Sequence, residues 1–251
     1  MLTLALPGLT LSACSAPSPD SGARAAIVDQ LYILQPNQAF IDQATAELEA
    51  FGFEVDVYQG EEVSVKLYRE LPQYGYKLII FRAHSGLMQR GEDSQLEVKR
   101  ATYLFTAEAY KQTKYVREQL DDQILPAEMV EDFPLVFAVN SKFVLESMEG
   151  RFEDTVIIMM GCSTTYLDDM ATAFILRGAS SYLGWDGSVG LDYVDRATAN
   201  LIINLCDKEM TIEQAVAEIG PDPDWGAGLR YYPAESGSQT LTELVAKTAR
   251  E

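Results

Sequence analysis

Two mostly apolar runs constrain the fold of this 251-residue chain more than any other feature. They lie at residues 76–81 (YKLIIF) and 155–160 (TVIIMM). Strands that are apolar on both faces are typical of parallel sheets, because helices cover such sheets on both sides. The two runs therefore indicate buried strands of one parallel sheet rather than half-exposed strands of an antiparallel one.

The rest of the chain alternates shorter strand patterns with helical periods. Further strands are expected at residues 26–34, 53–58, 97–106, 134–139 and 181–185. Helices are expected between Asn37 and Gly52, at 63–71, 115–129, 166–177 and 194–206, and from Thr211 to Gly220. Residues 91–150 are less regular and are interpreted as an insertion over one end of the sheet. This order predicts an α/β fold, a single three-layer α/β/α domain over residues 25–251 with a mainly parallel central sheet.

Charge and composition exclude several functions. The formal net charge is −19, and such a chain repels nucleic acid, which we therefore exclude as a partner. One histidine and three cysteines are too few for a His-rich metal site, and no metal or cofactor is expected. No stretch of 18 apolar residues occurs, so no ordinary transmembrane helix is expected.

The N-terminus has the pattern of a secretory signal. Residues 2–13 are uncharged and apolar or small, and the sequence LSAC at residues 11–14 resembles a bacterial lipobox. That resemblance implies that Cys14 is lipidated and becomes the first mature residue. Residues 15–23, rich in Ser, Pro and Gly, would then form a flexible tether. We expect residues 1–24 to anchor an extracytoplasmic lipoprotein, with the lipid as its only membrane contact; the alternative is an N-terminus without such a role.

Reactive side chains follow both buried runs. His84 comes shortly after residues 76–81, and Cys162 shortly after residues 155–160. The carboxyl ends of parallel strands meet at one edge of a sheet, where ligands of open α/β folds bind. A cysteine nucleophile needs a nearby base, and His84 is the only histidine. The backbone N–H groups of Cys162 and of residues after His84, Gly86 above all, are candidates to bind an oxyanion.

These motifs resemble those of the caspase-like cysteine peptidases. An apolar strand followed by His-x-Gly, and another followed by Gly-Cys, is the organisation of that superfamily. Residues 156–189 (VIIMMGCSTTYLDDMATAFILRGASSYLGWDGSV) are most similar to its gingipain-like and CHAT-domain branches. The resemblance implies a caspase-hemoglobinase-like fold with His84 and Cys162 as catalytic residues. The family usually has Gly directly after the histidine, where this chain has Ser85, and Ala or Ser before the cysteine, where it has Gly161.

The resemblance also suggests a substrate pocket. In the superfamily, the segment after the strand at residues 181–185 often walls the pocket for the side chain before the cut bond. Asp186, with Asp192 as its substitute, would favour a basic substrate residue there, and Trp185 would wall the pocket. The alternatives are loop carboxylates on an acidic surface and a tryptophan in the core.

Two functions remain open for the folded domain. The first is a lipoprotein cysteine endopeptidase that acts on peptide or protein substrates with a His84–Cys162 dyad and prefers basic residues. The second is an inactive caspase-like lipoprotein that binds a peptide or protein partner, which Ser85 favours. For Cys162 itself the alternatives are an inert buried thiol or a disulfide with Cys206. Cys206 lies on the apolar face of a predicted helix, so we expect it to pack in the core.

Overall fold

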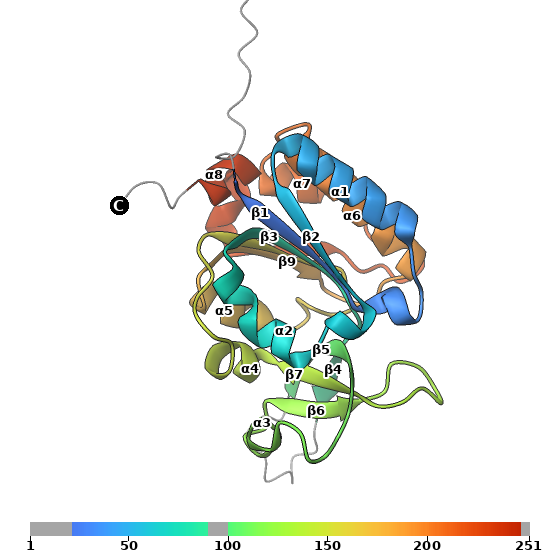
Figure 1. Ribbon diagram of the computed structural model, residues 1–251. Helices are drawn as coiled ribbons and strands as arrows, with labels where there is room; N and C mark the ends of the chain where they lie inside the picture. Colours follow the sequence, from blue (N-terminus) through green and yellow to red (C-terminus); the bar gives the residue numbers. More distant parts are fainter. Residues whose placement is uncertain (1–21, 90–99, 247–251) are drawn as a thin grey trace, which may run out of the picture.

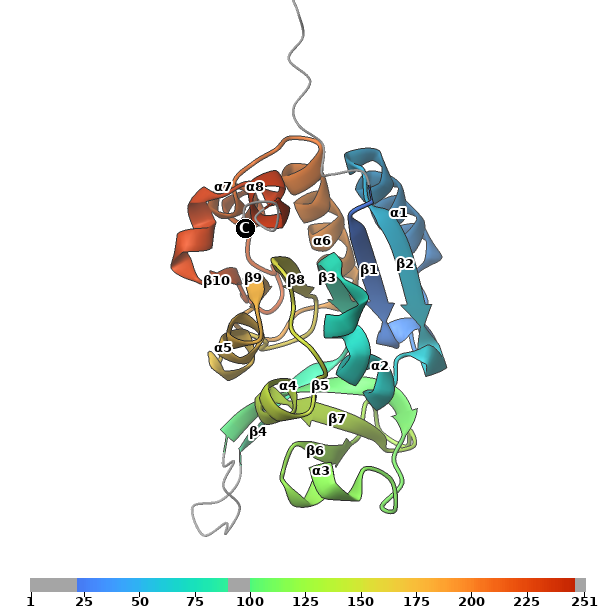
Figure 2. The ribbon, with the colours of Figure 1, turned by 60° about the vertical axis from the view of Figure 1, so that its left-hand side comes forward.

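The central sheet contains both apolar runs as neighbouring strands. The computed structural model describes residues 22–89 and 100–246. Sheet A has six strands in the order β10-β9-β8-β3-β1-β2, which can be followed across Figure 2. Five of them are parallel: β1 (Arg24–Asp29), β2 (Glu54–Gln59), β3 (Tyr76–Arg82), β8 (Thr155–Met159) and β9 (Ala179–Trp185). The edge strand β10 (Leu229–Tyr232) runs antiparallel to β9.

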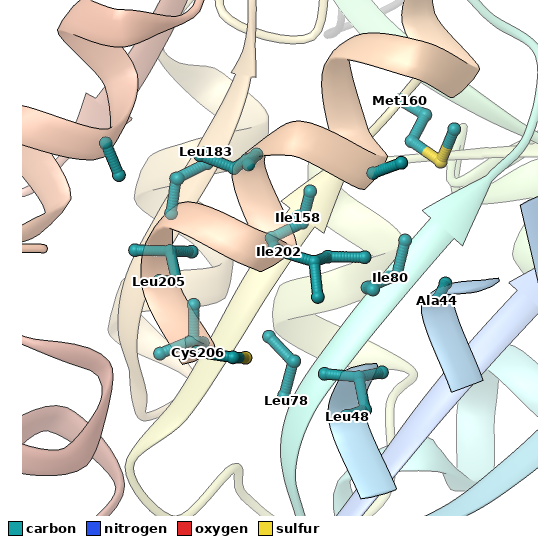
Figure 3. Close-up of a cluster of buried hydrophobic side chains, with 14 of the residues drawn as sticks. Ala44, Leu48, Leu78, Ile80, Ile158, Met160, Leu183, Ile202, Leu205 and Cys206 are labelled. Atoms are coloured by element: carbon teal, nitrogen blue, oxygen red, sulfur yellow. The ribbon is translucent and has the colours of Figure 1, made fainter. Parts of the chain in front are cut away.

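Helices cover both faces of sheet A because successive side chains of its strands point to opposite sides. On one face pack α1 (Gln38–Phe51), α6 (Leu191–Cys206), α7 (Ile212–Glu218) and α8 (Leu241–Val245) (Figure 1). On the other face pack α2 (Val65–Glu70), α4 (Ser141–Glu146) and α5 (Asp169–Leu176). Figure 3 shows the first interface, where Leu78 and Ile80 of β3 and Ile158 of β8 pack against α1 and α6. The predicted three-layer α/β/α fold with a mainly parallel sheet is confirmed.

The first predicted helix illustrates how local sequence sets these elements. The side chain of Asn37 accepts a hydrogen bond from the backbone N–H of Phe40, which caps the N-terminus of α1. Gly52 ends the helix with φ of 116°, a left-handed conformation that costs glycine little. Between these ends the predicted apolar positions are all buried against sheet A: Phe40, Ile41, Ala44 and Leu48.

The irregular middle segment forms most of a second sheet, and two of its strands lie near the strands predicted at residues 97–106 and 134–139. Sheet B is antiparallel, with strands in the order β4-β5-β7-β6. These are β4 (Ser85–Gln89), β5 (Arg100–Ala109), β7 (Val136–Asn140) and β6 (Ile124–Ala127), with α3 (Val116–Leu120) before β6. The helix predicted over residues 115–129 is therefore wrong beyond Leu120. The edge position of β6 tolerates Pro126, whose missing N–H would break a ladder in a central strand.

One other prediction needs correction at the end of β1. The strand expected over residues 26–34 ends at Asp29, and the chain turns into a 3₁₀ helix over Gln30–Ile33. Further 3₁₀ turns lie at Gly60–Glu62, Leu71–Tyr74 and Ala234–Ser238. Among the described helices, none combines the length and the apolarity that crossing a membrane requires.

Candidate active site

The pairing of β3 with β8 brings His84 and Cys162 to the same edge of sheet A. β3 and β8 are adjacent and parallel, with Phe81 opposite Met159. The next backbone contact follows the same order, since the N–H of Met160 donates to the carbonyl of Phe81 (2.9 Å). His84 and Cys162 each follow the last paired residue of their strand by three positions, so both lie just beyond the same ends of neighbouring strands. The expected juxtaposition at the carboxyl edge therefore follows from strand pairing.

Direct contacts join the two loops beyond the strand ends. The Ser85 hydroxyl donates a hydrogen bond to the carbonyl of Cys162 (2.6 Å). Gly161 allows this approach, because a Cβ at that position would lie 2.6 Å from the carbonyl oxygen of Ala83. β3 ends at Arg82 and β4 begins at Ser85, so His84 lies on the short link between the two sheets.

Cys162 is a half-buried free thiol held by the loop after β9. Its Sγ accepts a hydrogen bond from the N–H of Val189 (3.5 Å). Cys206 is also free, so the alternative of a Cys162–Cys206 disulfide is wrong. Cys206 packs in the core as predicted, where burial raises its pKa to about 12. The two thiols thus have different accessibility, and only Cys162 lies at the carboxyl edge.

His84 is anchored through its backbone, while its ring has no hydrogen-bond partner among the described residues. Its N–H donates to Oε1 of the fully buried Gln30 (2.9 Å), and its ring lies 6.2 Å from that of Phe105, centroid to centroid. Within residues 22–89 and 100–246, no group forms a hydrogen bond with the imidazole nitrogens. Burial lowers the pKa of His84 below 6.5, so the imidazole is neutral at pH 7 and can accept a proton.

A buried ion cluster beneath His84 was not predicted from the sequence. The guanidinium of Arg82 contacts Asp29 at 2.8 Å and binds both oxygens of Asp195, at 2.8 and 2.9 Å. Arg82 and Asp29 are fully buried, and Asn37 also donates to Asp195 (2.8 Å). Asp29 and Arg82 are the last residues of two apolar strands, β1 and β3. Opposite charges at the ends of two such strands were the sequence signal that could have predicted this ion pair. The cluster fixes the ends of β1 and β3, and with them the start of the His84 link.

The amides suggest an oxyanion site that differs in one residue from the prediction. The N–H of Cys162 has no acceptor within the described ranges, as the role requires. The N–H of Phe105 donates to the carbonyl of His84 (3.0 Å), and bonded pairs alternate along an antiparallel ladder. The amide of Gly86 therefore points toward β5, whereas that of Ser85 points away from it. Ser85 replaces Gly86 as the second candidate donor.

The three residues named for the substrate pocket do not line one hollow together: Asp186 borders a hollow beside β10, to which Trp185 and Asp192 do not contribute. Asp186 is engaged by this chain itself, because its carboxylate accepts from the N–H of Gly228 (2.7 Å) and pairs with Arg230 (2.8 Å). Trp185 is 1% exposed and packs edge-on against Tyr193, so it belongs to the core. Asp192 is exposed in the first turn of α6, where a carboxylate stabilises the helix N-terminus.

Two loops wall the thiol side of the site instead. Residues 186–190 follow β9, and residues 220–228 precede β10. The buried carboxylate of Asp222 joins them by accepting from the N–H groups of Gly190 (2.7 Å), Asp224 (2.8 Å) and Trp225 (3.0 Å). Burial alone would raise the pKa of Asp222, but these three donors lower it. Trp225 is 65% exposed on this braced loop, and nothing in its sequence context had marked it.

Comparison with known proteins adds no relative to this description. No protein-family model matches the chain, and no curated protein matches it. Cys14, the predicted lipidation site, lies outside the described residues.

Chemically, the described edge offers a half-buried thiol, a neutral imidazole on the adjacent loop and free backbone N–H groups. Such a set can support nucleophilic attack on a carbonyl carbon.

Proposed function

We propose that this protein is a cysteine peptidase that uses Cys162 as its nucleophile and His84 as its general base and acid. The observation that carries the proposal is the shared register of β3 and β8, reinforced by the hydrogen bond from Ser85 to the Cys162 carbonyl. The resemblance to caspase-like peptidases rests on the same two strand ends. The lipid anchor at Cys14 and an extracytoplasmic location are further parts of this proposal, supported by the lipobox-like sequence.

The reaction proceeds through an acyl-enzyme. Neutral His84 takes the proton of the Cys162 thiol, and the thiolate attacks the peptide carbonyl carbon to form a C–S bond. The N–H groups of Cys162 and Ser85 stabilise the negative charge on the carbonyl oxygen. The imidazolium then protonates the leaving amine as the C–N bond breaks. Water, deprotonated by His84, hydrolyses the thioester and restores the thiol.

A hollow on the His84 side of this pair could admit a substrate side chain. Next to the His84 link, a hollow of about 210 Å³ is lined mostly by apolar side chains, including Phe105 and Leu125. A preference for basic residues remains part of the proposal, but it rests on the net charge of −19, which attracts cations. Asp186 gives it no support, since Arg230 already neutralises that carboxylate.

The test compares the two thiols and the histidine. The full chain is assayed with a mixture of fluorogenic peptides, and Cys162→Ala and His84→Ala are compared with Cys206→Ala as the matched control. Loss of the nucleophile should lower kcat/KM by about 10³-fold or more, whereas Cys206→Ala keeps activity if it remains folded. If wild type cleaves nothing and Cys162 is alkylated no faster than Cys206, the peptidase proposal fails and a binding function takes its place.

A further inference from the structure

The two departures from the caspase-like pattern face each other across the site. Ser85 stands where the family usually has Gly, and Gly161 stands where it usually has Ala or Ser. In the structure, a Cβ added at Gly161 would overlap the Ser85 hydroxyl and lie 3.0 Å from the Ser85 Cβ. The side chain of residue 85 thus occupies the space that a side chain at residue 161 would need. The two departures compensate each other in volume.

Ser85 also binds one end of the peptide group between Cys162 and Ser163. The other end of that peptide group is hydrogen-bonded too. The Ser85 hydroxyl binds the carbonyl of Cys162 (2.6 Å), while the N–H of the same peptide group, that of Ser163, donates to the carbonyl of Gly187 (2.8 Å). The peptide plane after Cys162 is therefore fixed between the His84 link and the loop after β9. Ser163 has φ of 56°, a left-handed conformation that a non-glycine residue keeps only when its surroundings enforce it.

We propose that Ser85 is a positioning residue, which fixes the backbone of Cys162 opposite His84 and requires Gly at position 161. The role in the reaction rests on the proposed function, whereas the steric coupling of residues 85 and 161 does not. Ser85 acts on the thiol indirectly, by setting the backbone torsion that aims Sγ. In this view the serine after the histidine is an alternative way to build the site rather than the mark of an inactive protein.

The variants separate the hydroxyl from the volume of the side chain. Ser85→Ala removes only the hydrogen bond, and Ser85→Gly removes the whole side chain. Gly161→Ala introduces the overlap, and Ser85→Gly/Gly161→Ala relieves the part of it due to Ser85. Rescue should be partial, because the carbonyl of Ala83 stays 2.6 Å from the new Cβ. Ser238→Ala is the matched control, since the exposed Ser238 hydroxyl also donates to a backbone carbonyl, that of Glu235 (3.4 Å), and lies outside both loops of the site.

Three measurements on the full chain test the two parts. These are the urea midpoint of unfolding, kcat and KM on a cleaved peptide, and the iodoacetamide alkylation rate of Cys162, followed by mass spectrometry of its peptide across pH. We expect Ser85→Ala to lower kcat and alkylation about fivefold with little change in KM, the value of one hydrogen bond. Gly161→Ala should lower the urea midpoint strongly, and the double variant should recover part of that loss.

The outcomes distinguish this inference from the proposed function. Unchanged kcat, or unchanged alkylation where no peptide is cleaved, in Ser85→Ala would overturn the positioning role. Additive losses of stability in Ser85→Gly and Gly161→Ala would overturn the steric coupling. If wild type cleaves no peptide and its Cys162 is alkylated no faster than Cys206, but the double variant still recovers stability, the peptidase proposal fails while the coupling of residues 85 and 161 stands.

Discussion

The two sides of the carboxyl edge are held in physically different ways. The His84 side rests on buried side-chain ions, where Arg82 and Asp29 are both fully buried. The Cys162 side rests on hydrogen bonds between loops, among them those to the Asp222 carboxylate, and its ion pair Arg230–Asp186 has side chains that are 62% and 30% exposed. Buried ion networks depend on every member, whereas exposed pairs are screened by water. The histidine is thus held by the protein interior, and the thiol by loops at the surface.

This difference is chemically reasonable for the proposed reaction. The base must keep one orientation through proton transfer in both directions, which a rigid support favours. The nucleophile lies next to the loop at residues 186–190, which Asp222 joins to the loop at residues 220–228. Exposed Trp225 is held on the second of these loops by Asp222.

The largest expected effect is the loss of stability when Arg82 on the His84 side is replaced, compared with the loss when Arg230 on the Cys162 side is replaced. Arg82→Met leaves Asp29 and Asp195 as uncompensated buried charges, and we expect the free energy of unfolding to fall by about 3–5 kcal/mol. Arg230→Ala, on the exposed pair, should cost less than about 1 kcal/mol. Urea unfolding followed by circular dichroism measures both. Equal losses of free energy in the two variants would contradict the comparison, because the buried ion pairs would then stabilise the fold no more than the exposed one.

A smaller effect is expected at the brace on the thiol side. Asp222→Ala leaves three backbone N–H groups without their acceptor, and the free energy of unfolding should fall by about 1–3 kcal/mol. Asp224→Ala is the matched control, because the exposed Asp224 contributes only its backbone N–H and should change stability by less than about 0.5 kcal/mol.

Combining this change with the previous one sharpens the comparison. If the two sides are independent, the losses of Asp222→Ala and Arg82→Met should add to within about 0.5 kcal/mol. A larger interaction energy would mean that the His84 and Cys162 supports form one cooperative unit.

The layered fold could be predicted because its signals are local. Mostly apolar runs marked β3 and β8, and the helix between Asn37 and Gly52 has its cap, its apolar face and its stop within one segment. β4 and β6 were missed because they are short edge strands, of five and four residues, and so carry little of the alternating pattern that marks a strand. Pro126 in β6 also argues against a strand when that edge position is unknown.

The candidate site was predictable in its members and not in its contacts. Parallel strands place His84 and Cys162 at one edge from sequence order alone. The pairing of Asp186 with Arg230 depends on β10 lying antiparallel beside β9, which no local pattern announces. The burial of Trp185 and the exposure of Trp225 depend in the same way on how α6 and the loop before β10 pack. Residues whose role depends on a tertiary partner therefore could not be predicted from the sequence, whereas residues that directly follow a strand could.

The smallest expected effect is a pH dependence that belongs to the His84 side alone. Burial lowers the pKa of His84 in the folded protein below the ordinary 6.5 that it has when unfolded. As pH falls below 6.5, the unfolded chain binds a proton that the folded chain does not bind, so the free energy of unfolding decreases. Above 6.5 both states are neutral and this contribution is flat. Urea unfolding at about pH 7.5 and about pH 5.5 should show a decrease in wild type that is smaller in His84→Gln. Asp222 cannot produce this difference, because its lowered pKa confines its own contribution to pH values near and below 3.8. A decrease of equal size in His84→Gln would mean that other groups cause it and that the imidazole is not held neutral by its burial.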